Sequence, residues 1–361
     1  MNLVASIASF VMAIGFALII LDVAVNAFVA VRGRRNPWGA GTLEWAAAIP
    51  SPAYGFASIP IVQGGYPLHD DPDLALRIAR GEGYLGDASR NRRETLIVST
   101  ARGEPSQVVV LPGNSVLPFL LAVVTSTSFL APLFDAYIVA GLALVGVVAL
   151  ALVWAWGLGA RVDEGHVDAG HGPMLPLASE SPDPPGWWGS VFLLLADGVH
   201  FGSLLFGYAF LWTVAPNWPP HSYLQPQLWA VILALTGALA LTAGPRLAVR
   251  AIARGGAAWP TIALGIVGAL ALAIAAASVM LDRPDPASHA YDATLWLLAG
   301  HVGLHTFLSA IMLCYLAARV AAGYASPARI GEAGIVRLWA DFTVATGLVA
   351  LAAAWLPGAF A

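Results

Sequence analysis

The sequence predicts an all-α membrane protein with eight transmembrane helices, and three observations support that fold class. Charged residues make up only 11% of the 361 residues, against roughly 25% in soluble domains, while 58% are hydrophobic. Eight apolar stretches reach the length of about 20 residues that a helix needs to cross a bilayer. Because lipid offers no partner to exposed backbone groups, uniformly apolar runs of this length are expected to be helices.

The eight expected spans begin with one isolated N-terminal helix, which a long polar stretch separates from a bundle of seven. They cover residues 3–31, 115–134, 136–158, 187–214, 226–245, 258–281, 292–318 and 335–357. The predicted segments are therefore 1–35, an N-terminal helix; 36–114, a cytoplasmic tail and linker; and 115–361, the seven-helix domain. Within the linker, residues 96–100 and 108–111 are rich in β-branched residues and flank a Gly-Glu-Pro turn, which predicts a small hairpin.

The arginines predict the orientation of the spans. All 17 basic residues are arginine, and with alternating spans 16 of them fall on one side and Arg283 alone on the other. Since basic residues near helix ends stay in the cytoplasm, both termini are expected on the non-cytoplasmic face. The first span has its positive charges at its far end, as an internal span of a longer protein would, so we expect further natural sequence upstream of Met1.

Composition also argues against a nucleic-acid partner and against a disulfide or a site built from cysteines. The net charge is −4 and no run of like charge could follow a phosphate backbone, so nucleic acid is not an expected partner. Cys314 is the single cysteine, which rules out an intrachain disulfide and a site built from several cysteines.

Ionisable residues inside the expected spans are the candidate functional residues. Asp197 lies about 15 Å along the fourth span, near the bilayer midplane, where an unpaired ionisable group is costly and usually functional. His200 follows at i+3, and Gly198 with Gly202 forms a small-residue pair that favours close helix packing. The seventh span offers His301 and His305, which lie on one helix face at i,i+4 spacing.

Three interpretations of Asp197, His200 and His305 remain open from the residues alone. The first is a structural hydrogen-bonded cluster that joins helices. The second is a proton-handling site in which a buried carboxylate meets an imidazole. The third is a haem or metal site, although no HExxH motif is present and bis-histidine haem needs a second axial ligand from across the bundle.

At these residues the chain resembles cytochrome c oxidase subunit III, and the stretch before it resembles the end of subunit I, as in fused I+III chains. The likeness to the third and sixth helices of subunit III rests on Trp187-Trp188-Gly189, Asp197, Phe201, Tyr208, residues 210–220, residues 288–291, Gly300 and Gly303-Leu304-His305. The likeness to the last helix and tail of subunit I rests on residues 2–31, 36–45 and 54–60. A weaker likeness to the last helix of subunit III covers residues 339–357.

The resemblance implies a fold and a role. It implies a 2+5 arrangement of the seven helices, with a lipid-holding cleft between the first two and the other five. The family's membrane-embedded glutamate corresponds to Asp197, and its histidine corresponds to His305, since His301 is displaced by one position from the family's other histidine. The expected role is accessory: support of assembly, lipid binding and proton uptake in a proton-pumping oxidase of aerobic respiration.

The same resemblance implies where the cofactors and partners are. No haem-ligating or copper-ligating helix of subunit I is present in this sequence, so haem and copper are expected in a partner catalytic subunit, together with subunit II, in a bacterial plasma membrane. Bound phospholipid is expected on this chain, with head groups near Arg161, Arg246, Arg250 and Arg319. The alternative function is a stand-alone membrane carrier or a histidine-ligated membrane cytochrome.

Overall fold

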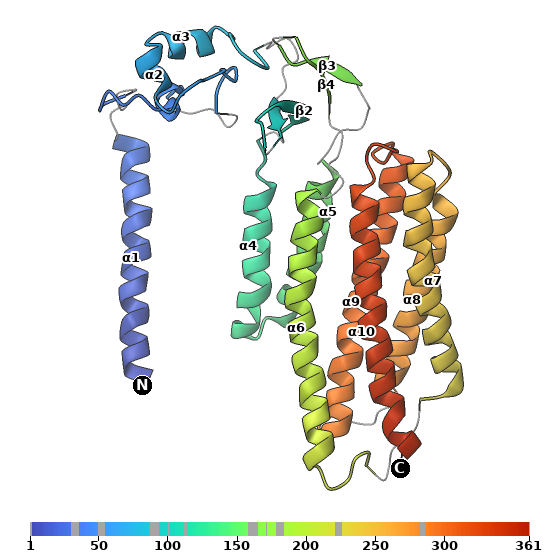
Figure 1. Ribbon diagram of the computed structural model, residues 1–361. Coiled ribbons are helices and arrows are strands. Elements are labelled where there is room, and N and C mark those ends of the chain that lie inside the picture. Colours follow the sequence, from blue (N-terminus) through green and yellow to red (C-terminus); the bar gives the residue numbers. More distant parts are fainter. Residues whose placement is uncertain are drawn as a thin grey trace. The chain divides into compact units, whose positions relative to one another are not determined.

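The computed structural model (Figure 1) describes all residues except 1, 30–35, 50–54, 87–93, 100, 112–113, 158–164, 171, 178–183, 221–225, 282–285 and 361. Within this described part, eight helices are long and apolar enough to cross a membrane. They are α1 (Asn2–Val29), α4 (Leu117–Leu130, continued by the 3-10 turn Ala131–Phe134), α5 (Tyr137–Trp156), α6 (Pro185–Val214), α7 (Leu228–Ala253), α8 (Trp259–Leu281), α9 (Ala290–Ala321) and α10 (Gly331–Phe360). The prediction of an all-α integral membrane protein is confirmed.

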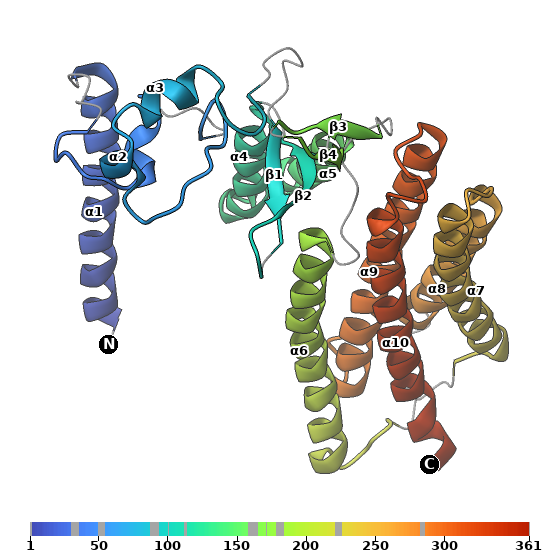
Figure 2. The same ribbon diagram turned by 45° about the horizontal axis from the view of Figure 1, so that its top comes forward.

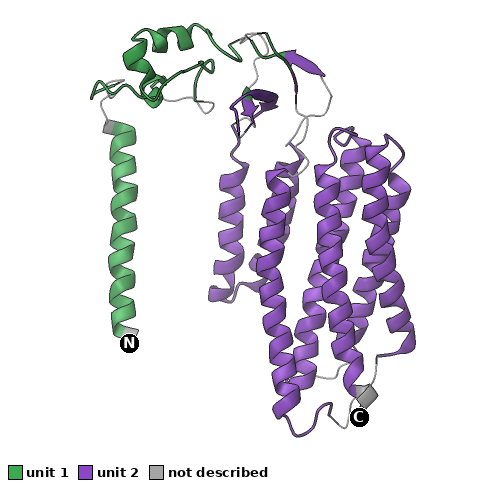
Figure 3. Ribbon diagram, in the orientation of Figure 1, with its two compact units in different colours: residues 1–95, 168–174 green, residues 96–167, 175–361 purple. Residues whose placement is uncertain are grey.

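The chain forms two compact units (Figure 3). The first comprises residues 1–95 and 168–174, and the second comprises residues 96–167 and 175–361. The boundary between the units within the linker lies at 95/96. The boundary expected from the change from polar to apolar sequence is at 114/115.

The first unit contains α1 and a small polar region. In α1 no described side chain is buried, as expected for a predominantly apolar helix that meets lipid or other membrane helices; Asp22 and Asn26, near its end, hydrogen-bond each other. The polar region contains the 3-10 turn Leu43–Ala46, α2 (Pro67–Asp70) and α3 (Leu74–Ala79) around a small core of Ala46, Leu74 and Ile78.

Two small two-stranded sheets lie in the connections between helices. The predicted hairpin is present as the two-stranded sheet of β1 (Glu94–Val98) and β2 (Pro105–Val110). A second sheet pairs β3 (His166–Asp168) with β4 (Met174–Pro176) in the connection before α6.

The seven helices of the second unit pack as a pair and a group of five, as the resemblance implied. Helices α4 and α5 pack on each other, and α6 to α10 pack among themselves. In the group of five, α9 and α10 lie between α6 on one side and α7 with α8 on the other (Figure 2). The core of the group includes the fully buried residues Leu241, Ile262, Leu298 and Leu313.

Helices α7 and α8 approach each other closely, and glycines make this possible. A Cβ added at Gly237 would lie 2.9 Å from the backbone nitrogen of Leu272, and one added at Gly244 would meet the backbone of Gly265. Gly202, which the sequence suggested as a packing position on α6, has no such neighbour within 4 Å. Small residues therefore promote close helix packing on α7 and α8 rather than at this position.

Helix α7 runs past the predicted end of its span at residue 245. It continues through Pro245 to Ala253, and the buried proline ring packs against the space left by the missing side chain of Gly265. Hydropathy ends the span where arginines begin, whereas the helix itself continues beyond that point and carries Arg246 and Arg250.

Candidate functional site

The candidate site is centred on Asp197, in the middle of the otherwise apolar helix α6. Helix α6 packs against α9 and α10, so a polar side chain on that face meets those helices instead of lipid. The Asp197 side chain remains 27% exposed, which means that part of the carboxylate lies open beside the two contacting rings.

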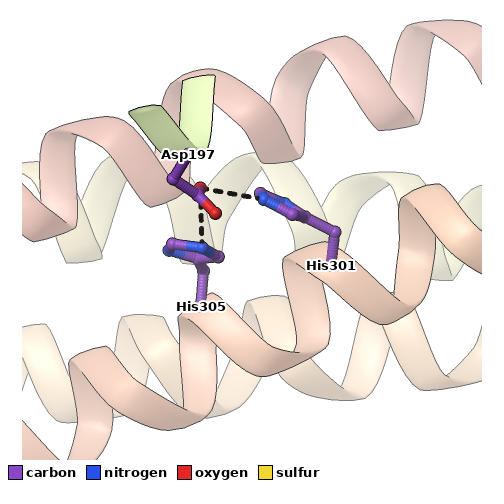
Figure 4. Close-up of side chains that lie close together, drawn as sticks. All are labelled: Asp197, His301 and His305. Carbon is purple, nitrogen blue, oxygen red and sulfur yellow. Dashed lines mark hydrogen bonds and ion pairs between the residues drawn. The ribbon is translucent and has the colours of Figure 1, made fainter. Parts of the chain in front are cut away.

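Two histidines of α9 contact this carboxylate (Figure 4). The Nε2 atoms of His301 and His305 each lie 3.0 Å from the same oxygen, Oδ2 of Asp197. Both histidines are buried, and their rings are stacked with centroids 4.4 Å apart. Because an ionised carboxylate only accepts hydrogen bonds, both contacts require the proton to be on Nε2, so each ring donates to Asp197.

Aromatic side chains from α6 and α10 surround the two imidazoles. The Phe201 ring lies 4.9 Å from His301, and the rings of Phe342 and Trp339 lie 5.2 and 5.7 Å from His305, centroid to centroid. The Nδ1 atoms of both histidines are buried without a hydrogen-bond partner. The three polar groups therefore interact mainly with one another, in surroundings of low polarity where such interactions are strong.

The structure brings together Asp197 and His305, and it replaces His200 by His301. His200 is exposed, and its ring centroid lies 6.1 Å from that of His301, so it does not take the place beside the carboxylate that its i+3 spacing suggested. The family pattern singles out His305, since His301 is displaced from it by one position. The i,i+4 spacing of the two histidines, visible in the sequence, already places both rings on one face of α9.

Asp197, His301 and His305 are also the one group of three potential metal ligands found among the described residues. Their ligand atoms lie within 4.8 Å of one another. The arrangement can exchange a proton between carboxylate and imidazole, join α6 to α9, or bind a cation.

The four arginines expected to contact lipid head groups have different surroundings. Arg161 lies outside the described residues. Arg246 forms an ion pair with Asp341 of α10 at 2.6 Å, and Arg250 is exposed one turn further along α7.

Arg319 differs most from the expected lipid contact, because it is buried. Its guanidinium binds Glu332 of α10 with an Nε–Oε2 distance of 2.7 Å, and it lies 4.1 Å from the ring centroid of Tyr324. It also donates to the carbonyl oxygen of Trp156 at 3.0 Å. Arg319 is thus a helix-joining residue in this structure, and protein groups occupy the positions at which a head group would bind.

Similarity to known proteins covers part of the chain. The chain is 30% identical over 126 residues to cytochrome c oxidase subunit 1 of Alkalihalophilus pseudofirmus. It is 36% identical over 122 residues to cytochrome c oxidase subunit 1 of Bacillus sp. (strain PS3). Each match covers 34% of this chain but only 16% of the relative. No protein-family model matches the chain.

The predicted resemblance to cytochrome c oxidase is confirmed. Over about a third of its length the chain is similar to cytochrome c oxidase subunit 1, and in its described part eight apolar helices agree with an integral membrane protein.

Proposed function

We propose that this chain is an accessory, non-catalytic part of a proton-pumping haem–copper oxidase. In this proposal α1 packs against the helices of a catalytic subunit I core, and α4 to α10 form a subunit III-like bundle that supports assembly, lipid binding and proton uptake. Haem and copper are bound by the catalytic core, and subunit II completes the complex in a bacterial plasma membrane. The similarity to subunit 1 supports membership of such a complex.

The observation that carries the proposal is the cluster of Asp197, His301 and His305. A carboxylate in the middle of a membrane helix is costly unless paired, and here two imidazoles of a neighbouring helix pair with it. With hydrogen bonds of 3.0 Å on both sides, Asp197 exchanges a proton with either ring without a change of helix position. A proton enters or leaves the cluster on the side where the Asp197 carboxylate is exposed.

Phospholipid binding is proposed for the cleft between the α4–α5 pair and the group of five. Arg161 and Arg250 are the head-group contacts kept in this proposal, because a guanidinium binds phosphate through two hydrogen bonds. Arg250 is exposed near the end of α7, a helix that packs on α8 and α10, so its lipid lies outside this cleft. Arg246 and Arg319 instead hold acidic residues of α10.

The geometry does not favour a histidine-ligated cytochrome. In such a protein the two axial histidines approach the haem iron from opposite faces. His301 and His305 are stacked side by side and aim at one oxygen atom, which leaves no space for a porphyrin plane between them. A carrier with interrupted helices is likewise disfavoured, since α6 to α10 are each one continuous α-helix over the described residues.

Replacement of Asp197 in the assembled complex tests the proton-uptake role. In Asp197→Asn the side chain keeps its shape and an accepting oxygen but loses its ability to take up a proton, whereas Asp197→Ala removes both. We expect both variants to co-purify with the oxidase core and to lose activity faster during turnover than the unmodified complex. His200→Ala, on the exposed face of the same helix, serves as the matched control.

Unchanged turnover and unchanged inactivation lifetime in both Asp197 variants would confine the residue to packing. Failure of the chain to co-purify with haem-containing and copper-containing subunits would overturn the accessory role itself.

A further inference from the structure

The cluster at Asp197 contains more ligand groups than an acid–imidazole pair needs. The carboxylate has two oxygens, yet His301 and His305 both place Nε2 at 3.0 Å from the same one, Oδ2. The three ligand atoms come from two helices and converge within 4.8 Å of one another (Figure 4). Two imidazole nitrogens and a carboxylate oxygen this close together are the ligand types and the spacing from which a zinc site with three protein ligands is built.

The cluster also lacks a compensating positive charge from arginine. Two arginines of the bundle already have acidic partners: Arg246 is paired with Asp341, and Arg319 is paired with Glu332. In the described part of the chain the ion-pair partners of Asp197 are the two histidines, which leave a net negative charge when they are neutral. The two imidazoles hydrogen-bond the charge without neutralising it, and a proton or a bound cation would neutralise it at this depth.

We propose that Asp197, His301 and His305 bind a divalent transition-metal ion of the Zn²⁺ class. Zinc takes imidazole nitrogen and carboxylate oxygen ligands at about 2.0–2.2 Å, which in a tetrahedral site separates neighbouring ligand atoms by roughly 3.2–3.6 Å. The present O–N distances of 3.0 Å need to widen by only a few tenths of an ångström. Three protein ligands leave the fourth position for water.

The surroundings suit an ion that is held away from bulk water but can still reach the site. Phe201, Trp339 and Phe342 cover the imidazoles. The neighbouring groove of about 540 Å³ between α6 and α10 is lined by apolar residues and by Asp341, and it does not include Asp197. An ion therefore reaches the cluster from the partly exposed side of the Asp197 carboxylate itself.

Metal binding has a consequence for the proposed proton role. A bound ion occupies the carboxylate and both Nε2 atoms, so none of them can exchange a proton while it is present. The ion would therefore inhibit proton uptake through this cluster. Only this consequence rests on the proposed function; the binding of the ion does not.

The test measures zinc on the full chain, purified in detergent with a tag that contains no histidine. The protein is stripped with a chelator, equilibrated with Zn²⁺ and washed, and metal per chain is determined by elemental analysis; Co²⁺ is used as a spectroscopic probe. We expect one Zn²⁺ per chain and a tetrahedral Co²⁺ spectrum that Zn²⁺ abolishes. His301→Asn and His305→Asn should each weaken binding more than about tenfold, while His200→Asn and His166→Asn should bind as tightly as the unmodified chain.

Three outcomes would overturn the metal site: substoichiometric zinc, a weak octahedral Co²⁺ spectrum, or undiminished binding in His301→Asn and His305→Asn. Because the Co²⁺ spectrum is recorded on the unmodified chain, it decides the matter even if a variant does not fold. The measurement needs no turnover, so a failed metal site is distinguishable from a failed proton role, which is tested with metal-free complex.

Discussion

The guanidinium of Arg319 lies 3.0 Å from the carbonyl oxygen of Trp156, so a residue of α9 caps the C-terminus of α5. The ring of Trp156 in turn packs edge-on against Tyr315 and Tyr324, at 5.8 and 5.5 Å between centroids. A cation at a helix C-terminus is favourable because the last carbonyl groups carry partial negative charge. These contacts join the α4–α5 pair to the group of five helices.

Replacement of Arg319 should therefore loosen that junction. Arg319→Gln removes the ion pair with Glu332 and the cap on α5, and we expect it to lower the free energy of unfolding by about 1.5–3 kcal/mol. Arg319→Lys keeps the charge but loses the planar fork and the stacking on Tyr324, and should recover only part of the loss. Denaturant unfolding in detergent measures both, with the exposed Arg250→Gln as control; equal stability of Arg319→Gln and the control would contradict this role.

Hydropathy was sufficient to predict the eight spans, because bilayer thickness and backbone hydrogen bonding leave few alternatives. Close packing was harder to predict. Gly202 and Gly237 look alike in the sequence, yet only the second lies against a neighbouring backbone. Which helices approach closely depends on how all of them pack together, and a single span does not contain that information.

The candidate site was predicted in part for a related reason. Asp197 and His305 stood out as ionisable groups in apolar helices, but His200 and His301 compete for the same carboxylate and the choice depends on how α6 is rotated against α9. The prediction for Arg319 differs from the structure because an arginine at a helix end can face lipid or protein. Its burial depends on Glu332 and on the end of α5, which lie far from it in sequence.

Tyr208 should stabilise the C-terminal end of α10 by supplying a hydrogen bond that Pro357 cannot make. Pro357 has no N–H, so it cannot donate to the carbonyl oxygen of Ala353, and the buried Tyr208 hydroxyl donates to that oxygen instead at 2.6 Å. Tyr208→Phe leaves the oxygen unsatisfied and should cost about 1–3 kcal/mol of unfolding free energy. In a Pro357→Ala background the helix supplies its own donor, so the same substitution should cost clearly less; an equal cost in both backgrounds would refute the explanation.

The effects of removing His301 and His305 on the free energy of unfolding should not be additive. In the metal-free chain, His301→Ala or His305→Ala leaves Asp197 one imidazole, and each change should cost about 1 kcal/mol of unfolding free energy. The double variant leaves the carboxylate without either ring and should cost about 3–5 kcal/mol, more than the two single changes together. Repeating the cycle with Asp197→Asn, which carries no charge, should reduce the excess. Additive single and double effects would show that the rings do not share the carboxylate.

The two ends of the α6–α10 bundle should differ in their accessibility from outside the cell. Arginine placement predicts that the turn after α7 lies in the cytoplasm and the turn before α9 on the other face, and both Ala253 and Ser288 are exposed. In a chain with Cys314→Ser, we expect a membrane-impermeant thiol reagent to label Ser288→Cys in intact cells, and Ala253→Cys only after the membrane is permeabilised. Labelling of Ala253→Cys in intact cells would reverse the orientation, and with it the assignment of Arg250 to the cytoplasmic leaflet.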